Sequence, residues 1–188
     1  MNKKSKDFYF DGYWQSEKYF IDHREALLDI FTLSKEISHQ SKAYLQGITK
    51  SNSISLHIMR GDYVSNESTN KIHGTCDVEY YQQAFSKIKE THDNAHFFVF
   101  SDDLDWAKDN LGFIDKITYI ELAEDIPDHE EMFLMSQCNH NIIANSSFSW
   151  WGAWLNQHIN KIIIAPKNWF RVDIHDTKDL TPADWTLI

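Results

Sequence analysis

The sequence of 188 residues is poor in the residues that mark several protein classes. It holds two cysteines, three prolines and six glycines, and no apolar run approaches the roughly 18 residues that a transmembrane helix needs. Cys76 and Cys138 lie far apart, without CxxC or zinc-site spacing, so we expect two buried free thiols in a reducing compartment. The amino terminus, MNKKSKDFYF, lacks the apolar core of a secretory signal. We therefore expect a cytoplasmic protein, at most peripheral to the inner face of a membrane.

Basic residues are also scarce. Eighteen lysines and arginines face 28 acidic residues, a formal net charge of −10. Proteins that bind phosphate backbones are basic, so nucleic-acid binding is excluded as the main function. This composition still allows a local basic pocket that binds one small anion. The GxGxxG, GxxxxGK[ST], HExxH and GxSxG motifs are absent too, and with them the enzyme classes they mark.

What is present is an alternation of short apolar runs and amphipathic segments after residue 52. Each run has about five residues, is rich in β-branched or aromatic types, and ends at a polar residue, which is typical of buried strands. The runs are 54–59, 96–100, 116–120, 140–144 and 161–165. The alternation predicts an α/β fold, a Rossmann-like parallel sheet with helices on both faces.

The segments between these runs predict helices with recognisable caps. Asp77 is placed to cap a helix over 78–90, and Gly112 to end a short helix over 104–111. Asp128 with Glu131 has the spacing of a capping box. Asn145 or Ser146 precedes SFSWWGAWLNQH, in which Phe148, Trp151 and Leu155 are spaced for one face. Three tryptophans in this helix cannot share one face, so we expect at least one to line a pocket or an interface.

Residues 1–50 do not fit the alternation. Arg24 to Gln46 predicts one long helix, too little for a second globular core. We expect two parts: residues 1–50 as a remnant of another domain with a connecting helix, and residues 51–188 as the ligand-binding domain.

The first predicted strand ends in HIMRGDY, residues 57–63. Arg60 at the carboxyl end of a strand is suited to clamp a phosphate through two hydrogen bonds. The alternative is a structural turn in which Arg60 pairs with Asp62. His57, inside the strand, is either a hydrogen-bonded structural residue or a base.

The second strand is followed by SDDLD, residues 101–105. Its carboxylates could accept hydrogen bonds from a sugar or a base. Asp103 and Asp105 also form the acid-x-acid pair that holds Mg²⁺ or Mn²⁺ on a nucleotide diphosphate. The alternative is helix capping, with Ser101 or Asp102 beginning the next helix.

The fourth strand is followed by NSSFSWWGAW, residues 145–154. A helix amino terminus with small hydroxyl residues is an anion site, because free N–H groups, the positive end of the dipole and serine donors coincide there. The alternative is an ordinary cap before a core-packed aromatic helix. Together the three strand ends suit a diphosphate ligand at one edge of the sheet.

These residues carry a resemblance to the α-1,2-fucosyltransferase family, glycosyltransferase family 11. The similar segments are GYWQSEKYF, HIMRGDY, FFVFSDD, FLMSQCNHNIIANSSFSWWGAWL and IIIAPKNWF, which together run from Gly12 to Phe170. The family's amino-terminal half, with its GGLGNQ-type segment, has no counterpart in the chain.

The resemblance implies the donor-binding carboxyl-terminal half of a GT-B glycosyltransferase, an enzyme of two Rossmann-like domains. It implies inverting transfer of L-fucose from GDP-β-L-fucose to the 2-hydroxyl of a terminal galactose, in the synthesis of bacterial surface glycans such as O-antigen. No metal or other cofactor is implied. The implied partners are GDP-fucose, a galactose-terminated glycan, and either a missing amino-terminal half or a second copy.

The resemblance also assigns site residues. The implied catalytic residues are Arg60, Asp62 and His57, with Asp62 as our candidate base. The implied donor-binding residues are Arg60, Asp102, Asp103, Asn145, Ser146, Ser147 and Glu130, with Glu131 as the alternative to Glu130 near the guanine.

One departure from the family motif bears on activity. The family has two arginines before Gly-Asp, and this chain has Met59 and Arg60. A thioether cannot donate a hydrogen bond to phosphate, and strand alternation keeps Arg60 from taking the place of Met59. Two further interpretations therefore stay open: an inactive GDP-binding remnant of the family, and a metal-dependent nucleotide-sugar transferase that uses Asp103 and Asp105.

Overall fold

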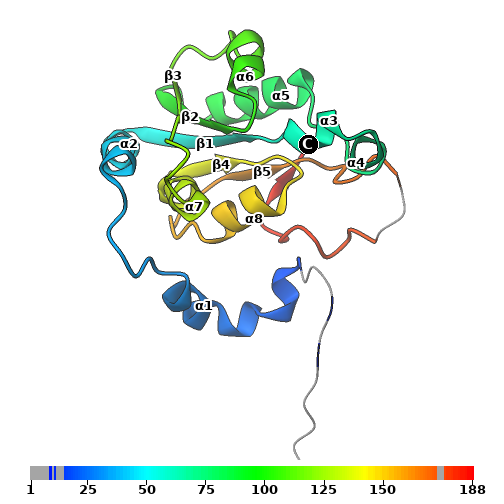
Figure 1. Cartoon of the computed structure of the whole chain (residues 1–188), viewed down its shortest axis with the longest axis horizontal. Helices are drawn as coiled ribbons and strands as arrows, with labels where there is room; N and C mark the ends of the chain where they lie inside the picture. The colour runs from blue at the N-terminus through cyan, green and yellow to red at the C-terminus, as the bar shows by residue number, and fades with distance from the viewer. Residues whose placement is uncertain (1–8, 10, 12–14, 173–175) are drawn as a thin grey trace, which may run out of the picture.

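The structure is a computed structural model of the chain, and it describes all residues except 1–8, 10, 12–14 and 173–175 (Figure 1). The side chain of Asp62 also lies outside the described part. No described helix combines the length and the apolar character needed to cross a bilayer.

The centre of the molecule is a six-stranded parallel sheet in the order β3-β2-β1-β4-β5-β6. The strands are β1 (Asn52–Ile58), β2 (Ala95–Ser101), β3 (Ile117–Tyr119), β4 (His140–Ile142), β5 (Ile163–Ala165) and β6 (Thr186–Leu187). The predicted α/β fold and the five predicted strands are confirmed. The sequence analysis missed β6, a two-residue strand that extends the sheet through the pair Ile164–Thr186.

Helices cover both faces of this sheet, as predicted. Figure 1 shows α5 (Val78–Lys89) and α6 (Leu104–Asn110) on one face, and α7 (Asp128–Gln137) and α8 (Ser147–Trp154) on the other. Residues alternate between the faces because successive strand side chains point in opposite directions. Leu56 and Ile58 of β1 pack in the core under α5 and α6, whereas Phe98 and Phe100 of β2 pack in the core with α7.

Most of the predicted helices begin after a residue whose side chain caps them. Asp77 accepts a hydrogen bond from the N–H of Tyr80 and begins α5, as predicted. Ser146, one of the two predicted caps, begins α8. The cap of α6 is Asp103 instead of Ser101 or Asp102, and the helix begins at Leu104, as predicted.

The capping box predicted for α7 is wrong. Pro127 holds the cap position in an extended conformation, without a side-chain cap, and Asp128 is the first helical residue. Proline favours an extended backbone before a helix, and an acid in the first turn is stabilised by the helix dipole without capping it. The acidic residues were therefore correctly assigned to the helix start but in the wrong register.

The long helix predicted over Arg24–Gln46 is wrong too. The chain forms two 3-10 turns (Glu17–Tyr19 and Ile21–His23), then α1 (Arg24–Ile30), a break, and α2 (His39–Thr49). At the break, the side chain of Ser38 caps α2, and the Ser38 N–H donates to the Glu130 carboxylate at 2.9 and 3.1 Å. A contact with a residue 92 positions away thus fixes the break.

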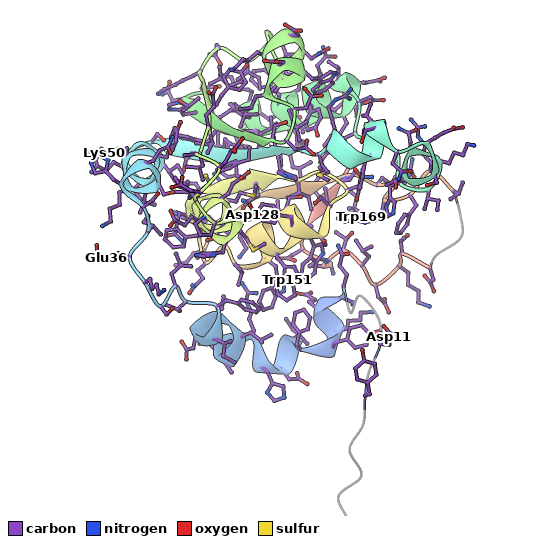
Figure 2. All side chains as sticks on the ribbon, in the orientation of Figure 1. Asp11, Glu36, Lys50, Asp128, Trp151 and Trp169 are labelled. Atoms are coloured by element: carbon purple, nitrogen blue, oxygen red, sulfur yellow. The ribbon has the colours of Figure 1, made fainter. Side chains whose placement is uncertain are left out.

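The segment before α2 packs beneath α8 (Figure 2). The ring of Phe20 stacks on Trp151 at 5.3 Å and meets Trp154 edge-on at 5.2 Å. The face predicted for α8 is wrong: Trp150 and Trp154 are buried, whereas Trp151 is only half-buried. Trp151 packs on Phe20 of the amino-terminal segment, so the expectation that one tryptophan lines a pocket or an interface stays a prediction.

Candidate functional site

The carboxyl ends of β1, β2 and β4 meet at one edge of the sheet, where α3 (Gly61–Ser65) and α4 (Glu67–Ile72) also begin. The chain leaves β1 toward β2 and β3 on one side, and reaches β4 and β5 on the other. Such a change of direction opens a crevice at the carboxyl ends of the strands, the usual ligand position in open parallel sheets. The predicted strand-end residues of β1, β2 and β4 lie at this edge.

Arg60 is held at this edge by two neighbours. Its Nε donates to Oδ2 of Asp103 at 3.1 Å, and its guanidinium carbon lies 4.3 Å from the ring centre of Trp106. The predicted alternative pairing with Asp62 lies outside the described side chains. Asp103 also caps α6 through the N–H of Trp106 at 3.1 Å. Asp103 therefore positions both a helix and the arginine.

Asp102, which the resemblance assigns to donor binding, holds the turn after β1 in the structure. Its two carboxylate oxygens accept the backbone N–H groups of Arg60 at 2.9 Å and Gly61 at 2.8 Å. A Cβ on Gly61 would lie 2.7 Å from Oδ2 of Asp102, closer than real side chains allow. Gly61 is therefore needed for this close approach, and Asp102 fixes the turn that carries Arg60.

His57 lies on the opposite face of β1 from Ile58. Its ring is 5.9 Å from that of Phe148 on α8, and its side chain is 5% exposed. Burial lowers the pKa of His57 to about 4, so the ring is neutral near pH 7. Its Nδ1 has no hydrogen-bond partner among the described residues. Alternation carried one residue past β1 places Met59, not Arg60, on this α8 side.

The amino terminus of α8 offers backbone N–H groups beside β4. Ser146 is buried and accepts a hydrogen bond from the N–H of Phe148 at 3.3 Å, while Ser147 is exposed as the first helical residue. The first turn contains no acidic residue to oppose an anion. This is the combination that the sequence predicted for an anion site.

The side chain of Asn145 joins two neighbouring loops by hydrogen bonds. Its Nδ2 donates to the carbonyls of His73 at 3.0 Å, Gly74 at 3.2 Å and Trp169 at 3.2 Å. The Sγ of Cys76 donates to its Oδ1 at 3.8 Å. Asn145 is therefore a positioning residue for the loops around the carboxyl end of β4. Cys76 is half-buried and Cys138 buried, and both are free thiols, so the predicted burial is complete only for Cys138.

The two acidic candidates of α7 separate in the structure. Glu130 is buried and uses both carboxylate oxygens to hold Ser38. Burial, followed by the charges of Asp128 and Asp102, raises the pKa of Glu131 to about 7. The charge of Asp102 contributes to this shift, so Glu131 lies within electrostatic range of the strand-end site.

A cavity of about 750 Å³ opens at the same edge, and Asn145 is the predicted site residue that lines it. Other lining residues are Thr75, Glu79, Lys167 and Asn168. Sequence reasoning missed this group. A usable signal was present, since Lys167 and Asn168 lie two and three residues after the fifth predicted strand, near the strand end like the other site residues. Among the described residues, no three His, Cys, Asp or Glu side chains gather as a metal site would require.

Comparison with known proteins supports the family resemblance that the strand-end motifs indicated. The model of glycosyl transferase family 11 matches residues 2–188. The chain belongs to glycosyl transferase family 11. An alpha-1,2-colitosyltransferase of Escherichia coli is 43% identical over 95% of this chain and 62% of its own length.

Two further relatives of this family 11 chain widen the comparison. The O-antigen biosynthesis glycosyltransferase WbnK of Escherichia coli is 36% identical over 85% of this chain and 54% of its own length. The galactoside 2-alpha-L-fucosyltransferase SEC1 of Bos taurus is 27% identical over 77% of this chain and 41% of its own length. The chain thus spans between two fifths and two thirds of the length of these relatives.

Proposed function

We propose that this family 11 protein takes part in transfer of L-fucose from GDP-β-L-fucose to the 2-hydroxyl of a terminal galactose in a surface glycan. The observation that carries the proposal is the contact between α3, which follows β1, and the residues before α8: the Tyr63 hydroxyl donates to the Asn145 carbonyl at 3.3 Å, in a chain that the family model matches throughout. The names of the relatives support a deoxy-sugar donor, a galactoside acceptor and O-antigen synthesis. In this proposal the chain is the donor-binding half of a GT-B enzyme.

The site would act mainly by electrostatics. The acceptor oxygen attacks the anomeric carbon of fucose, the bond to the β-phosphate oxygen breaks, and GDP leaves with the electron pair. The N–H groups at the start of α8 and the hydroxyl groups of Ser146 and Ser147 would hold the phosphates as negative charge grows on them. Transfer on these terms needs no metal.

The proton of the acceptor hydroxyl needs a base. Asp62, in α3, is the candidate from the sequence. Glu131 is a second candidate, because its pKa of about 7 suits proton transfer near neutral pH and its charge interacts with that of Asp102. His57 would serve as a neutral hydrogen-bonding group.

Met59 lowers the expected affinity for the donor, because its thioether cannot donate a hydrogen bond to phosphate. An inactive GDP-binding remnant of the family is therefore the second candidate function. Arg60 is pinned toward α6 by Asp103 and Trp106, so its guanidinium does not replace a missing arginine on the α8 side. A second donor sugar is supported by the 43% identical relative, which is named for colitose. Colitose is fucose without the 3-hydroxyl, and a site for it would lack a partner for that hydroxyl.

The test is a calorimetric titration with GDP, followed by transfer assays with GDP-fucose and GDP-colitose on a galactoside. We expect GDP binding, and we expect Met59→Arg to tighten it more than tenfold because a charged donor is added on the α8 side. Lys50→Arg, a surface change elsewhere, serves as the control. A folded chain that binds no GDP, with or without Met59→Arg, would rule out the donor site. GDP binding without transfer of either sugar would favour the inactive remnant.

A further inference from the structure

The cavity at the carboxyl ends of β4 and β5 is separate from the Arg60 turn, and Asn145 is the one residue of its lining that the resemblance assigned to donor binding. Its volume of about 750 Å³ lies within the range of small-molecule sites. Arg60, Asp102, Asp103, Ser146 and Ser147 are not among its lining residues. Figure 2 shows Trp169, one of its walls, on the side of the molecule away from Lys50.

Hydrogen bonds hold the walls of this cavity in place. Asn145 joins the 73–74 loop to Trp169 through three carbonyls at 3.0–3.2 Å. The N–H of Arg171 donates to the carbonyl of Ile72 at 2.8 Å, and its Nη1 donates to Oδ1 of Asn70 at 2.7 Å. A cavity whose walls are tied together across about 100 residues of sequence is preformed, which lowers the entropic cost of binding.

The polar groups of the lining carry both signs and both hydrogen-bonding roles. Lys167 and Arg171 are donors, Asp77 and Glu79 are acceptors, and Asn168 provides both. The side chains of Lys167 and Asn168 are exposed and form no hydrogen bond or ion pair within the described part of the chain. Hydrogen-bonding capacity is therefore left for a ligand.

The acidic side of the lining does not suit a phosphate. The amino terminus of α5 borders the cavity, but Asp77 already caps it with a carboxylate, at 2.9 Å from the N–H of Tyr80. Glu79 adds a second negative charge in the first turn. An anion there would meet repulsion, whereas a neutral molecule with several hydroxyl groups can donate to the carboxylates and accept from Lys167 and Asn168. Phe170, a half-buried aromatic residue of the lining, suits the apolar face of a sugar ring.

We propose that this cavity binds the galactose end of the glycan acceptor. The proposal rests on the proposed transferase function and names the place of its second substrate. Asn145 lines the cavity and directly precedes Ser146, the cap of α8, so a sugar in the cavity lies beside the helix start assigned to the donor phosphates. The chain would then carry part of the acceptor site itself, within the half assigned to the donor.

The test measures lactose, a galactose-terminated disaccharide, by saturation-transfer NMR titration, and GDP by calorimetry on the same samples. The variants are Lys167→Ala and Asn168→Ala, both exposed changes, with Lys50→Ala as the matched surface control. We expect each cavity variant to raise the lactose Kd about three- to tenfold, the effect of one lost hydrogen bond. The GDP Kd should stay within twofold, and Lys50→Ala should change neither.

The outcomes separate this inference from the proposed function. Absence of lactose binding by the folded chain, or equal lactose affinity in the cavity variants and the control, overturns the acceptor cavity. Loss of GDP affinity in those variants also overturns it and makes the cavity the donor site. Failure of GDP to bind any variant, while lactose binding depends on Lys167 and Asn168, refutes the donor site and supports the cavity.

Discussion

Asp102 holds the turn after β1 by accepting the backbone N–H groups of both Arg60 and Gly61, at 2.9 and 2.8 Å. The adjacent Asp103 takes the guanidinium of the same Arg60 at 3.1 Å. Two consecutive acids after β2 thus fix the backbone and the side chain of one residue after β1. The geometry of the strand-end site depends on this pairing.

The first prediction concerns Gly61. We expect Gly61→Ala to lower the free energy of unfolding by about 1–3 kcal/mol, because the new methyl group displaces the Asp102 carboxylate from two N–H groups. Urea denaturation measures this. Gly112→Ala is the control, because its Cβ would meet nothing within 4 Å. Equal stabilities of the two variants would contradict the role given to Asp102.

Asp103 has two tasks that substitutions can separate. Asn keeps the cap of α6 but loses the charge that faces Arg60, whereas Ala loses both. We expect Asp103→Asn to cost less than 1 kcal/mol, because this ion pair is partly exposed to solvent, and Asp103→Ala to cost about 1 kcal/mol more. Thermal or urea denaturation of both variants gives the difference. If Asn proved as costly as Ala, the ion pair would outweigh the cap.

Glu131 gives a pH-dependent prediction. Its folded pKa of about 7 lies above the ordinary 4.5, so between these values the native state holds a proton that the unfolded chain releases. Its contribution to stability therefore falls as pH rises through this window, by about 2–3 kcal/mol. Glu131→Gln should match the wild type near pH 4 and exceed its free energy of unfolding at pH 8.

The control for this experiment is Glu124→Gln, a change at an exposed glutamate. The quantity to compare is the pH dependence of each variant's difference from the wild type, since other groups titrate in the same range. A constant difference for Glu131→Gln between pH 4 and 8 would show that this carboxyl ionises normally.

The amino-terminal segment gives the fourth prediction. We expect Phe20→Ala to cost about 1–2 kcal/mol and to expose the segment around α1 to proteolysis, because Phe20 contacts Trp151 and Trp154. Limited proteolysis with mass spectrometry locates the cuts. Ile30→Ala, at a side chain that is 73% exposed, should leave the cleavage rate unchanged. Slow cleavage of Phe20→Ala would show that other contacts suffice to hold the segment.

The sequence could predict elements whose signals are local. Asp77 and Ser146 caps, the five apolar runs and the strand-end motifs depend on neighbours within a few residues. The break between α1 and α2 could not be predicted, because it depends on Glu130 reaching Ser38. Nor could the buried face of α8, where Phe20 and the amino-terminal segment cover Trp151.

For the site, the sequence alone determined which residues end each strand and so share one edge of the sheet, because parallel strands place their carboxyl ends together. Tertiary structure decided what each residue does there. In the folded chain Asp102 and Asp103 bind the Arg60 turn, and Glu130 accepts a hydrogen bond from Ser38. Asn145 joins the loops that form the walls of the cavity. Hydrogen bonds between residues about 40 to 90 positions apart make these choices, and such partners follow from the packing of the whole chain and not from local pattern.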